Sequence, residues 1–145
     1  MPTDKTIPRE RGAYSIFTPV TLRYSDQDPN QHINNVAITA YLESGRVGFM
    51  HNLFGDRLPD RRMVLASMTV DYLQEILYPD TVEVGGRLAD VGGRSITTQY
   101  AIFQGDKCCV VSQSVNVFFN PETRRSMAPP DDIRQYLDEH MAAMT

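Results

Sequence analysis

The sequence contains no tryptophan, only two cysteines and no apolar run long enough to cross a membrane. Cys108 and Cys109 are adjacent in a strand-like segment, where neighbouring side chains point to opposite faces, so we expect one thiol in the core and one at the surface. No C-x-x-C pair occurs, and His32, His51 and His140 lie far apart in the sequence. We therefore expect no disulfide, no metal site and no cofactor.

An excess of positive charge is also missing. Fourteen Lys and Arg against 18 Asp and Glu give a net charge of −4 over 145 residues, and basic runs do not exceed the pairs Arg61-Arg62 and Arg124-Arg125. This balance argues against nucleic acid as a partner. The first fifteen residues carry charges and prolines but no apolar segment of a signal peptide. We expect a cytoplasmic protein with a flexible arm over residues 1–14 and a single domain over residues 15–145.

The periodicity of apolar residues predicts an α+β protein. Alternation of apolar and polar residues is typical of strands with one buried face, and short Gly, Pro and Asp connections between such segments favour antiparallel hairpins. A short amphipathic helix should follow Pro129-Pro130. The remaining expected elements are a strand at 17–24, a helix at 34–54, and strands at 63–77, 81–91, 94–104 and 107–119.

The helix expected at 34–54 carries the strongest local signals. Asn34 or Asn35 can cap its start, and Gly55 follows its end. Apolar residues cover most of its circumference, which predicts burial on most sides. Because a helical glycine costs about 1 kcal/mol relative to alanine, Gly45 and Gly48 indicate the close approach of a sheet.

The loop before this helix, SDQDPNQH, holds most of the reactive side chains. It joins a strand to a helix start, where unpaired N–H groups and the helix dipole stabilise negative charge. A carboxylate placed there can attack a carbonyl, or activate water to attack it, while those N–H groups hold the carbonyl oxygen. Such clusters of Asp, Asn and Pro also form ordinary turns and caps.

The spacing D-x-x-x-H-x-N-N in this loop, within VTLRYSDQDPNQHINNVAITAYLESGR, resembles hotdog-fold thioesterases of the 4-hydroxybenzoyl-CoA thioesterase type. The later segments VDYLQEILYPDTVEV, VGGRSITTQYAIF and VNVFFNPETRR resemble that family in the same order, so the likeness runs from about Phe17 to Arg125. The resemblance implies a hotdog fold, in which a five-stranded antiparallel sheet wraps a long central helix. It also implies hydrolysis of an acyl-CoA or acyl-carrier-protein thioester in a homodimer or homotetramer.

The resemblance assigns roles to the loop residues. Asp28 becomes the catalytic carboxylate, as nucleophile or as base for water, and the backbone N–H near Asn35 polarises the thioester carbonyl. His32 positions the loop by hydrogen bonds. Asn34 caps the helix or orients the carbonyl. We interpret Asp26 as a turn residue or a solvated residue.

Other residues complete the expected site. Glu43 is a rival acid, because some hotdog proteins carry their acid on the central helix, although an i, i+3 pair with Arg46 also accounts for it. The phosphates of coenzyme A need basic or polar groups near the tunnel mouth. The candidates are Arg94, Ser95, Lys107 and Arg124 with Arg125.

Two positions depart from the family pattern. Gln31 and Pro79 stand where the family has glycine, and a side chain at Gln31 disfavours a positive φ or narrows the pocket. Gln31 therefore keeps a non-hydrolytic acyl-thioester-binding protein open as an alternative. An enoyl-thioester hydratase is a weaker alternative, because the hydratase pattern D-x-N-P-x-H-x-D-P is absent.

Overall fold

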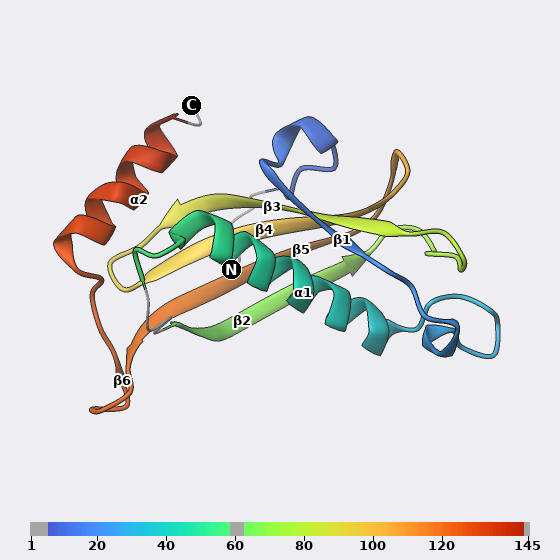
Figure 1. Cartoon of the computed structure of the whole chain (residues 1–145), viewed down its shortest axis with the longest axis horizontal. Coiled ribbons are helices and arrows are strands. Elements are labelled where there is room, and N and C mark those ends of the chain that lie inside the picture. Colours follow the sequence, from blue (N-terminus) through green and yellow to red (C-terminus); the bar gives the residue numbers. More distant parts are fainter. Residues whose placement is uncertain (1–5, 59–62, 144–145) are drawn as a thin grey trace.

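Five long antiparallel strands form one sheet, and a long helix lies across one of its faces (Figure 1). The computed structural model describes residues 6–58 and 63–143. The strand order is β1-β3-β4-β5-β2, and a short sixth strand pairs with β5. This arrangement confirms the expected α+β hotdog layout. The strands are β1 (Ile16–Val20), β2 (Met63–Tyr72), β3 (Val82–Val91), β4 (Ser95–Gln104), β5 (Lys107–Asn120) and β6 (Arg125–Ser126), and the helices are α1 (Asn35–Phe54) and α2 (Asp131–Ala143), with 3₁₀ turns at Arg11–Ala13 and Tyr24–Asp26.

Helix α1 begins, and approaches the sheet, as its sequence predicts. The Asn34 side chain caps it by accepting a hydrogen bond from the N–H of Ala37 at 2.7 Å. A Cβ atom at Gly45 would overlap the side chain of Val84 on β3, and one at Gly48 would overlap Thr18 on β1. The two helical glycines therefore allow α1 to approach the sheet closely, as expected.

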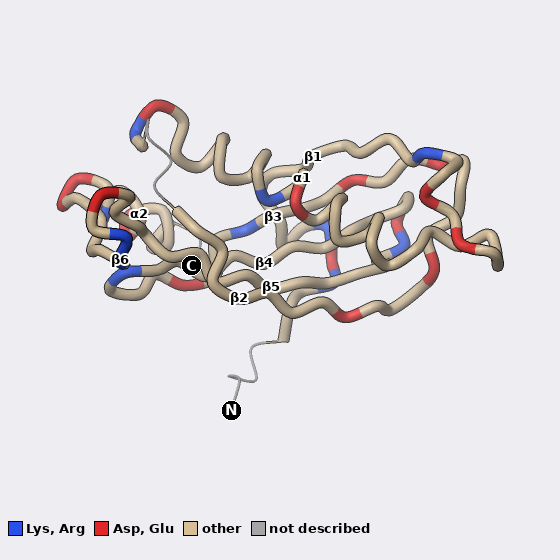
Figure 2. Tube along the Cα trace, turned by 90° about the horizontal axis from the view of Figure 1, so that it is seen from below, with Lys and Arg blue, Asp and Glu red and all other residues tan. Residues whose placement is uncertain are grey.

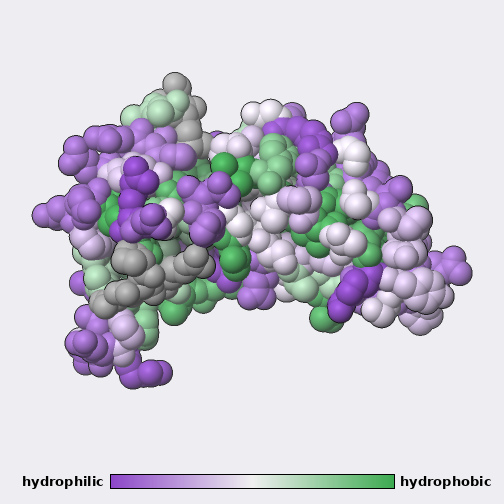
Figure 3. Space-filling model, in the orientation of Figure 1, coloured by the Kyte–Doolittle hydropathy of each residue, from purple (hydrophilic) through white to green (hydrophobic). Residues whose placement is uncertain are grey.

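The prediction that α1 is buried on most sides is wrong for a single chain. Val36 is 82% exposed and Val47 is 47% exposed, whereas the buried residues of α1 face the sheet. The reason is that the sheet covers only one side of the helix. Hydrophobic patches are visible among hydrophilic ones on this face of the molecule (Figure 3). The apolar circumference of α1 thus leaves exposed apolar residues that no described part of the chain covers.

Two strand ends differ from the expected ones. Strand β1 ends at Val20 rather than near Tyr24, because Arg23 and Asp26 turn the chain through a short 3₁₀ helix. Strand β2 ends at Tyr72 rather than near residue 77. The N–H groups of Leu73 and Gln74 both donate to the carbonyl of Cys109, which interrupts the regular pairing with β5. The residues between β1 and α1, 21–34, are called the connecting loop below.

The second face of the sheet is also partly covered. Tyr14 packs with Phe103 and Cys108 in a cluster of its own, with the Tyr14 and Phe103 ring centroids 6.0 Å apart. Both cysteines are therefore buried, and the expectation of one surface thiol is wrong. The covering residues come from the segment expected as a flexible arm, in which Arg11 also contacts Glu83 at 2.8 Å. Residues 1–5 of that arm and the pair at 61–62 lie outside the described residues.

Helix α2 lies at the end of the molecule opposite the connecting loop (Figure 1). Its Ile133 and Leu137 are buried, as their spacing predicts, and the Tyr136 hydroxyl donates to the carbonyl of Leu53 at the end of α1. Arg57 lies over the Tyr136 ring, 4.1 Å from its centroid. No helix within residues 6–58 and 63–143 is both long and apolar enough to span a membrane.

Candidate active site

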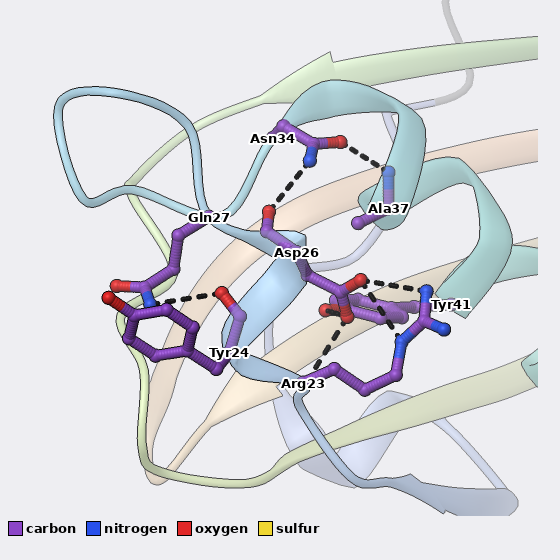
Figure 4. A network of polar contacts seen from close by, with 7 residues as sticks. All are labelled: Arg23, Tyr24, Asp26, Gln27, Asn34, Ala37 and Tyr41. Carbon is purple, nitrogen blue, oxygen red and sulfur yellow. Dashed lines mark hydrogen bonds and ion pairs between the residues drawn. The ribbon is translucent and has the colours of Figure 1, made fainter.

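Asp26 is the most fully bonded side chain of the connecting loop (Figure 4). Its Oδ1 accepts hydrogen bonds from the Arg23 guanidinium at 2.9 and 3.2 Å, and its Oδ2 accepts one from the Tyr41 hydroxyl at 2.6 Å. The residue is only 4% exposed. Asp26 is a turn residue, as expected, because its carboxylate also accepts from the Arg23 backbone N–H in the 3₁₀ turn. The alternative expectation of a solvated residue is wrong, because Tyr41 from α1 and Arg23 together enclose this carboxylate.

The protonation of Asp26 follows from these partners. Burial alone raises the pKa of its carboxyl, but the hydrogen bonds from Tyr41 and Arg23 outweigh burial and hold the pKa below the ordinary 3.8. Burial, and then the Asp26 carboxylate, raises the pKa of Tyr41. Tyr41 thus stays a donor and Asp26 an acceptor at neutral pH, and the pair fixes the loop against α1.

Asn34 connects the same network to the start of α1. Its Nδ2 and its backbone N–H both donate to the carbonyl of Asp26 at 2.8 Å, while its Oδ1 caps the helix. Both polar ends of the Asn34 side chain are therefore engaged in the fold. Within the part of the chain that the structure describes, the N–H groups of Asn35 and Val36 are left as donors at the exposed helix start.

Asp28 is held differently. Its Oδ1 accepts from the N–H groups of Asn30 at 2.9 Å and His32 at 3.1 Å, which closes a tight turn. Its backbone N–H donates to the carbonyl of His32 at 2.7 Å. Among the described residues, Oδ2 of Asp28 has no hydrogen-bond partner. The turn role and an available carboxylate oxygen thus exist in the same side chain.

Gln31 adopts the backbone conformation that a glycine would favour. Its φ is 65°, in the left-handed region, and its N–H donates to the carbonyl of Asp28 at 2.9 Å. The glutamine at this position therefore does not prevent the tight loop, although the conformation is strained for a residue with a Cβ. At the other departure from the family pattern, the Tyr78–Pro79 peptide bond is cis.

Two neighbouring depressions flank the connecting loop. One of about 490 Å³ is lined by Asp28 and by Tyr24 and Tyr78, whose rings lie 5.8 Å apart. The other, of about 410 Å³, lies over the start of α1 at Asn35. Ser25 lines both depressions, so the Asp28 carboxylate and the helix N-terminus border adjoining hollows.

His32 makes contacts through both its imidazole and its backbone N–H. Its Nε2 contacts the Glu75 carboxylate at 2.9 Å, and Glu75 lies in the connection between β2 and β3. The N–H of the next residue, Ile33, donates to the carbonyl of Ile76 at 3.1 Å. These contacts tie the loop to the connection between β2 and β3.

Glu43 and Asp28 line different hollows. Glu43 is eight residues beyond Asn35 on α1, which corresponds to about 12 Å along the helix axis. Its carboxylate lies 3.9 Å from the guanidinium of Arg46, and its side chain is 70% exposed. The two candidate acids thus belong to separate places, with Glu43 beside a narrow groove of about 100 Å³ between α1 and the sheet.

The candidate phosphate-binding residues are divided between the two ends of the sheet. Arg94, Ser95 and Arg124 lie near the turn that precedes β4 and the end of β5, and the Arg94 guanidinium donates to Ser126 at 3.3 Å. Lys107 starts β5 at the opposite end, on the side of the connecting loop. Positively charged positions near β6 and α2 are visible in Figure 2. A single chain therefore does not place all four candidate phosphate-binding residues at the same end of the sheet.

Sequence reasoning missed the burial of Asp26 between Arg23 and Tyr41. Its signal is the combination of Arg23, three residues earlier, with Tyr41 one turn and a half into α1, and only the fold brings them together.

Within residues 6–58 and 63–143, no group of three His, Cys, Asp or Glu side chains is arranged to hold a metal ion.

A long helix across an antiparallel sheet, preceded by a loop with an available carboxylate, defines the class of hotdog thioesterase-like proteins. The model of the thioesterase-like superfamily matches residues 22–137, and the chain belongs to that superfamily.

Solved structures agree with this assignment. A predicted thioesterase from Bacillus stearothermophilus is 36% identical, with a TM-score of 0.75 over 86% of this chain and 94% of that one. A thioesterase from Thermus thermophilus, solved with coenzyme A and zinc, is 28% identical, with a TM-score of 0.76 over 86% and 98% of the two chains. The uncharacterized YsmA of Bacillus subtilis is 25% identical over 130 residues, 86% of each chain. These likenesses support thioester hydrolysis as the general class of reaction.

Proposed function

We propose that this protein hydrolyses an acyl-CoA thioester to a free carboxylic acid and a thiol, with Asp28 as the catalytic carboxylate. The observation that carries the proposal is the available Oδ2 of Asp28 in a hollow that adjoins the exposed start of α1. Coenzyme A is favoured as the thiol because the similar Thermus thermophilus thioesterase was solved with it.

Two routes are consistent with this arrangement. In the first, Oδ2 of Asp28 attacks the thioester carbon, the C–S bond breaks to release the thiolate, and water hydrolyses the resulting anhydride. In the second, Asp28 takes a proton from water as the water attacks, and that proton passes to the departing thiol. In both routes the N–H groups of Asn35 and Val36 stabilise the oxyanion, and one water is consumed.

The uncovered surfaces of the chain favour a homodimer, from which a homotetramer can be built. Strand β2 is an edge of the sheet with exposed apolar residues, among them Val64 and Tyr72, and the outer face of α1 exposes Val36 and Val47. An edge strand of this kind is a template for pairing with another chain. A two-fold axis would pair β2 with its copy in antiparallel fashion.

Such a dimer also accounts for the divided basic residues. The two-fold axis reverses the strand direction, so it places the Arg94 and Arg124 end of one chain beside the connecting-loop end of the other. Lys107 lies at that loop end within its own chain. The phosphates of one coenzyme A can then meet cations from both chains. We expect Val47→Lys to give a monomer that loses turnover, whereas an active monomer in sedimentation would contradict this assembly.

The proposal is tested by following release of free acid from a panel of short, long and aromatic acyl-CoAs. Direct detection of the acid avoids thiol reagents, which react with cysteines as well. Wild type should turn over at least one member, and Asp28→Asn should abolish that turnover while folding and assembly persist. Loss in Glu43→Gln with activity kept in Asp28→Asn would instead make Glu43 the acid.

A binding protein without turnover is the second candidate. It is favoured by one observation, the use of Asp28 Oδ1 as a cap for its own loop. Titration of an acyl-CoA that is not hydrolysed, followed by recovery of the intact thioester, would establish this role in place of hydrolysis.

A further inference from the structure

A row of polar side chains lies on the inner face of the sheet, under α1, where an apolar core is usual. Thr98 and Tyr100 on β4 are fully buried, and so are their cross-strand partners Ser114 and Ser112 on β5. Asn116, next along β5, is buried as well. Buried polar groups are normally hydrogen-bonded, so each of these side chains needs a partner.

Two polar atoms of this row lack a hydrogen-bond partner among the described residues. The Ser112 hydroxyl donates to the carbonyl of Thr69 at 2.7 Å, and the Asn116 amide donates to the Thr98 hydroxyl at 3.1 Å. Among the described residues, the Tyr100 hydroxyl and Oδ1 of Asn116 have no hydrogen-bond partner. An unpaired buried hydroxyl destabilises the fold, which favours a role outside folding for the oxygen of Tyr100.

Tyr100 lines the narrow groove between α1 and the sheet. Its ring is only 1% exposed and packs edge-on against Phe49, with the centroids 6.1 Å apart, so its orientation is fixed. The largely exposed Glu43 and the partly buried Arg46 also line the groove. Its walls combine apolar and polar side chains, Leu42, Leu65 and Met68 with Thr39 and Ser114.

The electrostatics of the groove keep the Tyr100 phenol as a donor. Burial raises the pKa of Tyr100 to about 12, even though the nearby Thr98 hydroxyl and, more weakly, the Arg46 charge act in the opposite direction. The hydroxyl is therefore protonated at neutral pH. A buried donor on a residue that lines a groove of mixed apolar and polar walls suits an apolar chain that carries an oxygen acceptor.

We propose that this groove binds the acyl group of the substrate and that the Tyr100 hydroxyl donates a hydrogen bond to an oxygen substituent on it. The inference rests on the proposed thioesterase function and deepens it. The substrate class becomes acyl groups with a hydroxyl or oxo oxygen away from the thioester, rather than plain hydrocarbon chains.

The reach of the groove limits the position of that oxygen. Its lining residues on α1 run from Thr39 to Arg46, and their midpoint lies about 11 Å from the level of Asn35 along the helix axis. An acyl group held at the start of α1 by its carbonyl would need a chain of medium length to reach Tyr100.

The test compares plain and ω-hydroxylated acyl-CoAs of six, eight and ten carbons. Wild type should prefer the hydroxylated member at one length by about tenfold in kcat/KM, because only that member pairs with the buried hydroxyl. Tyr100→Phe removes the oxygen and keeps the ring, so it should lose this preference, with a kcat/KM for the hydroxylated chain no higher than for the plain chain of the same length. Tyr136→Phe, in α2, is the matched control and should keep the preference.

The outcomes separate this inference from the proposed function. Hydrolysis without a preference at any length, or a preference that survives in Tyr100→Phe, overturns the inference and leaves the thioesterase intact. If no acyl-CoA is hydrolysed, the proposed function fails. Titration of the corresponding S-alkyl-CoA thioethers then tests whether the groove binds the oxygen-bearing chain through Tyr100. Tighter binding of the hydroxylated thioether by wild type than by Tyr100→Phe supports the inference, and equal binding overturns it.

A stability measurement adds an independent readout. Because the Tyr100 hydroxyl has no partner among the described residues, Tyr100→Phe should unfold at the wild-type temperature or above it. A lower unfolding temperature would mean that the hydroxyl is bonded within the fold, which contradicts its role as a ligand donor.

Discussion

Asp26 and Asp28 are two residues apart and serve different purposes. Asp26 is buried, and its two oxygens accept four hydrogen bonds, three from Arg23 and one from Tyr41. Asp28 lies in an open hollow, and only one of its oxygens is used, by backbone N–H groups of its own loop. The first carboxylate fixes the loop to α1, whereas the second keeps one oxygen without a hydrogen-bond partner among the described residues. Proximity in sequence therefore says little about which acid is available for chemistry.

The largest expected effect is on turnover, from Asp28→Asn. The amide keeps an oxygen for the N–H groups of Asn30 and His32 but cannot act as a base or a carboxylate nucleophile. We expect kcat/KM to fall about a thousandfold, within the usual contribution of a catalytic base. Steady-state release of free acid measures this.

The control for this variant is its stability. Its unfolding temperature should stay within a few degrees of that of wild type. A similar activity in wild type and Asp28→Asn would remove Asp28 from the chemistry.

Asp26→Asn should produce the opposite pattern. It removes the charge that Arg23 and Tyr41 enclose, so we expect the free energy of unfolding to fall by about 2 kcal/mol. Urea unfolding measures this change, and Tyr41→Phe should reproduce about half of it. An Asp26→Asn protein as stable as wild type would mean that the network contributes nothing to the fold.

The stability should also depend on pH through Asp26. Its folded pKa lies below the ordinary 3.8, so the unfolded chain binds the proton more readily. The stabilisation is therefore complete above about pH 5 and is lost as the pH falls through 3.8 toward the folded pKa. Acid titration followed by circular dichroism should show this loss in wild type and a shallower one in Asp26→Asn. Parallel curves would exclude Asp26 as the cause.

The smallest expected effect comes from Gln31. Its φ of 65° is strained for a side-chain residue, so Gln31→Gly should raise the free energy of unfolding by about 1 kcal/mol. Asn30→Gly, at a neighbouring position without a positive φ, is the control and should lower it. A Gln31→Gly protein of lower stability would show that the side chain contributes more than the strain costs.

Local sequence patterns predicted the positions of the helices and strands better than they predicted which residues are buried. The helix at 34–54 was predicted from its cap, its glycines and its apolar content, and the structure confirms it. Its exposed residues Val36 and Val47 were not predicted, because a sequence shows that a residue is apolar but not which chain covers it. The predicted end of β1, at residue 24, was wrong for a related reason. The turn after Val20 depends on contacts of Asp26 with Arg23 and Tyr41, and one of these partners is fifteen residues away.

The candidate site shows the same limit. The connecting loop and the cap at Asn34 were predicted from spacing, and the structure brings Asp28, His32 and Asn35 together at one end of the molecule. Arg94 and Lys107 were grouped by charge alone, and they lie at opposite ends of the sheet because β4 separates them. Tyr100 gave no signal at all, since an aromatic residue in a strand is ordinary core until its hydroxyl proves to lack a partner.

The most direct test of the difference between the two aspartates is one experiment on three proteins. Release of free acid from the best acyl-CoA is followed for wild type, Asp26→Asn and Asp28→Asn at equal concentrations of folded protein and at neutral pH. We predict that Asp26→Asn retains most of the wild-type rate per folded molecule, whereas Asp28→Asn retains about a thousandth of it. Equal loss in both variants, or loss in Asp26→Asn alone, would contradict the assignment of catalysis to Asp28.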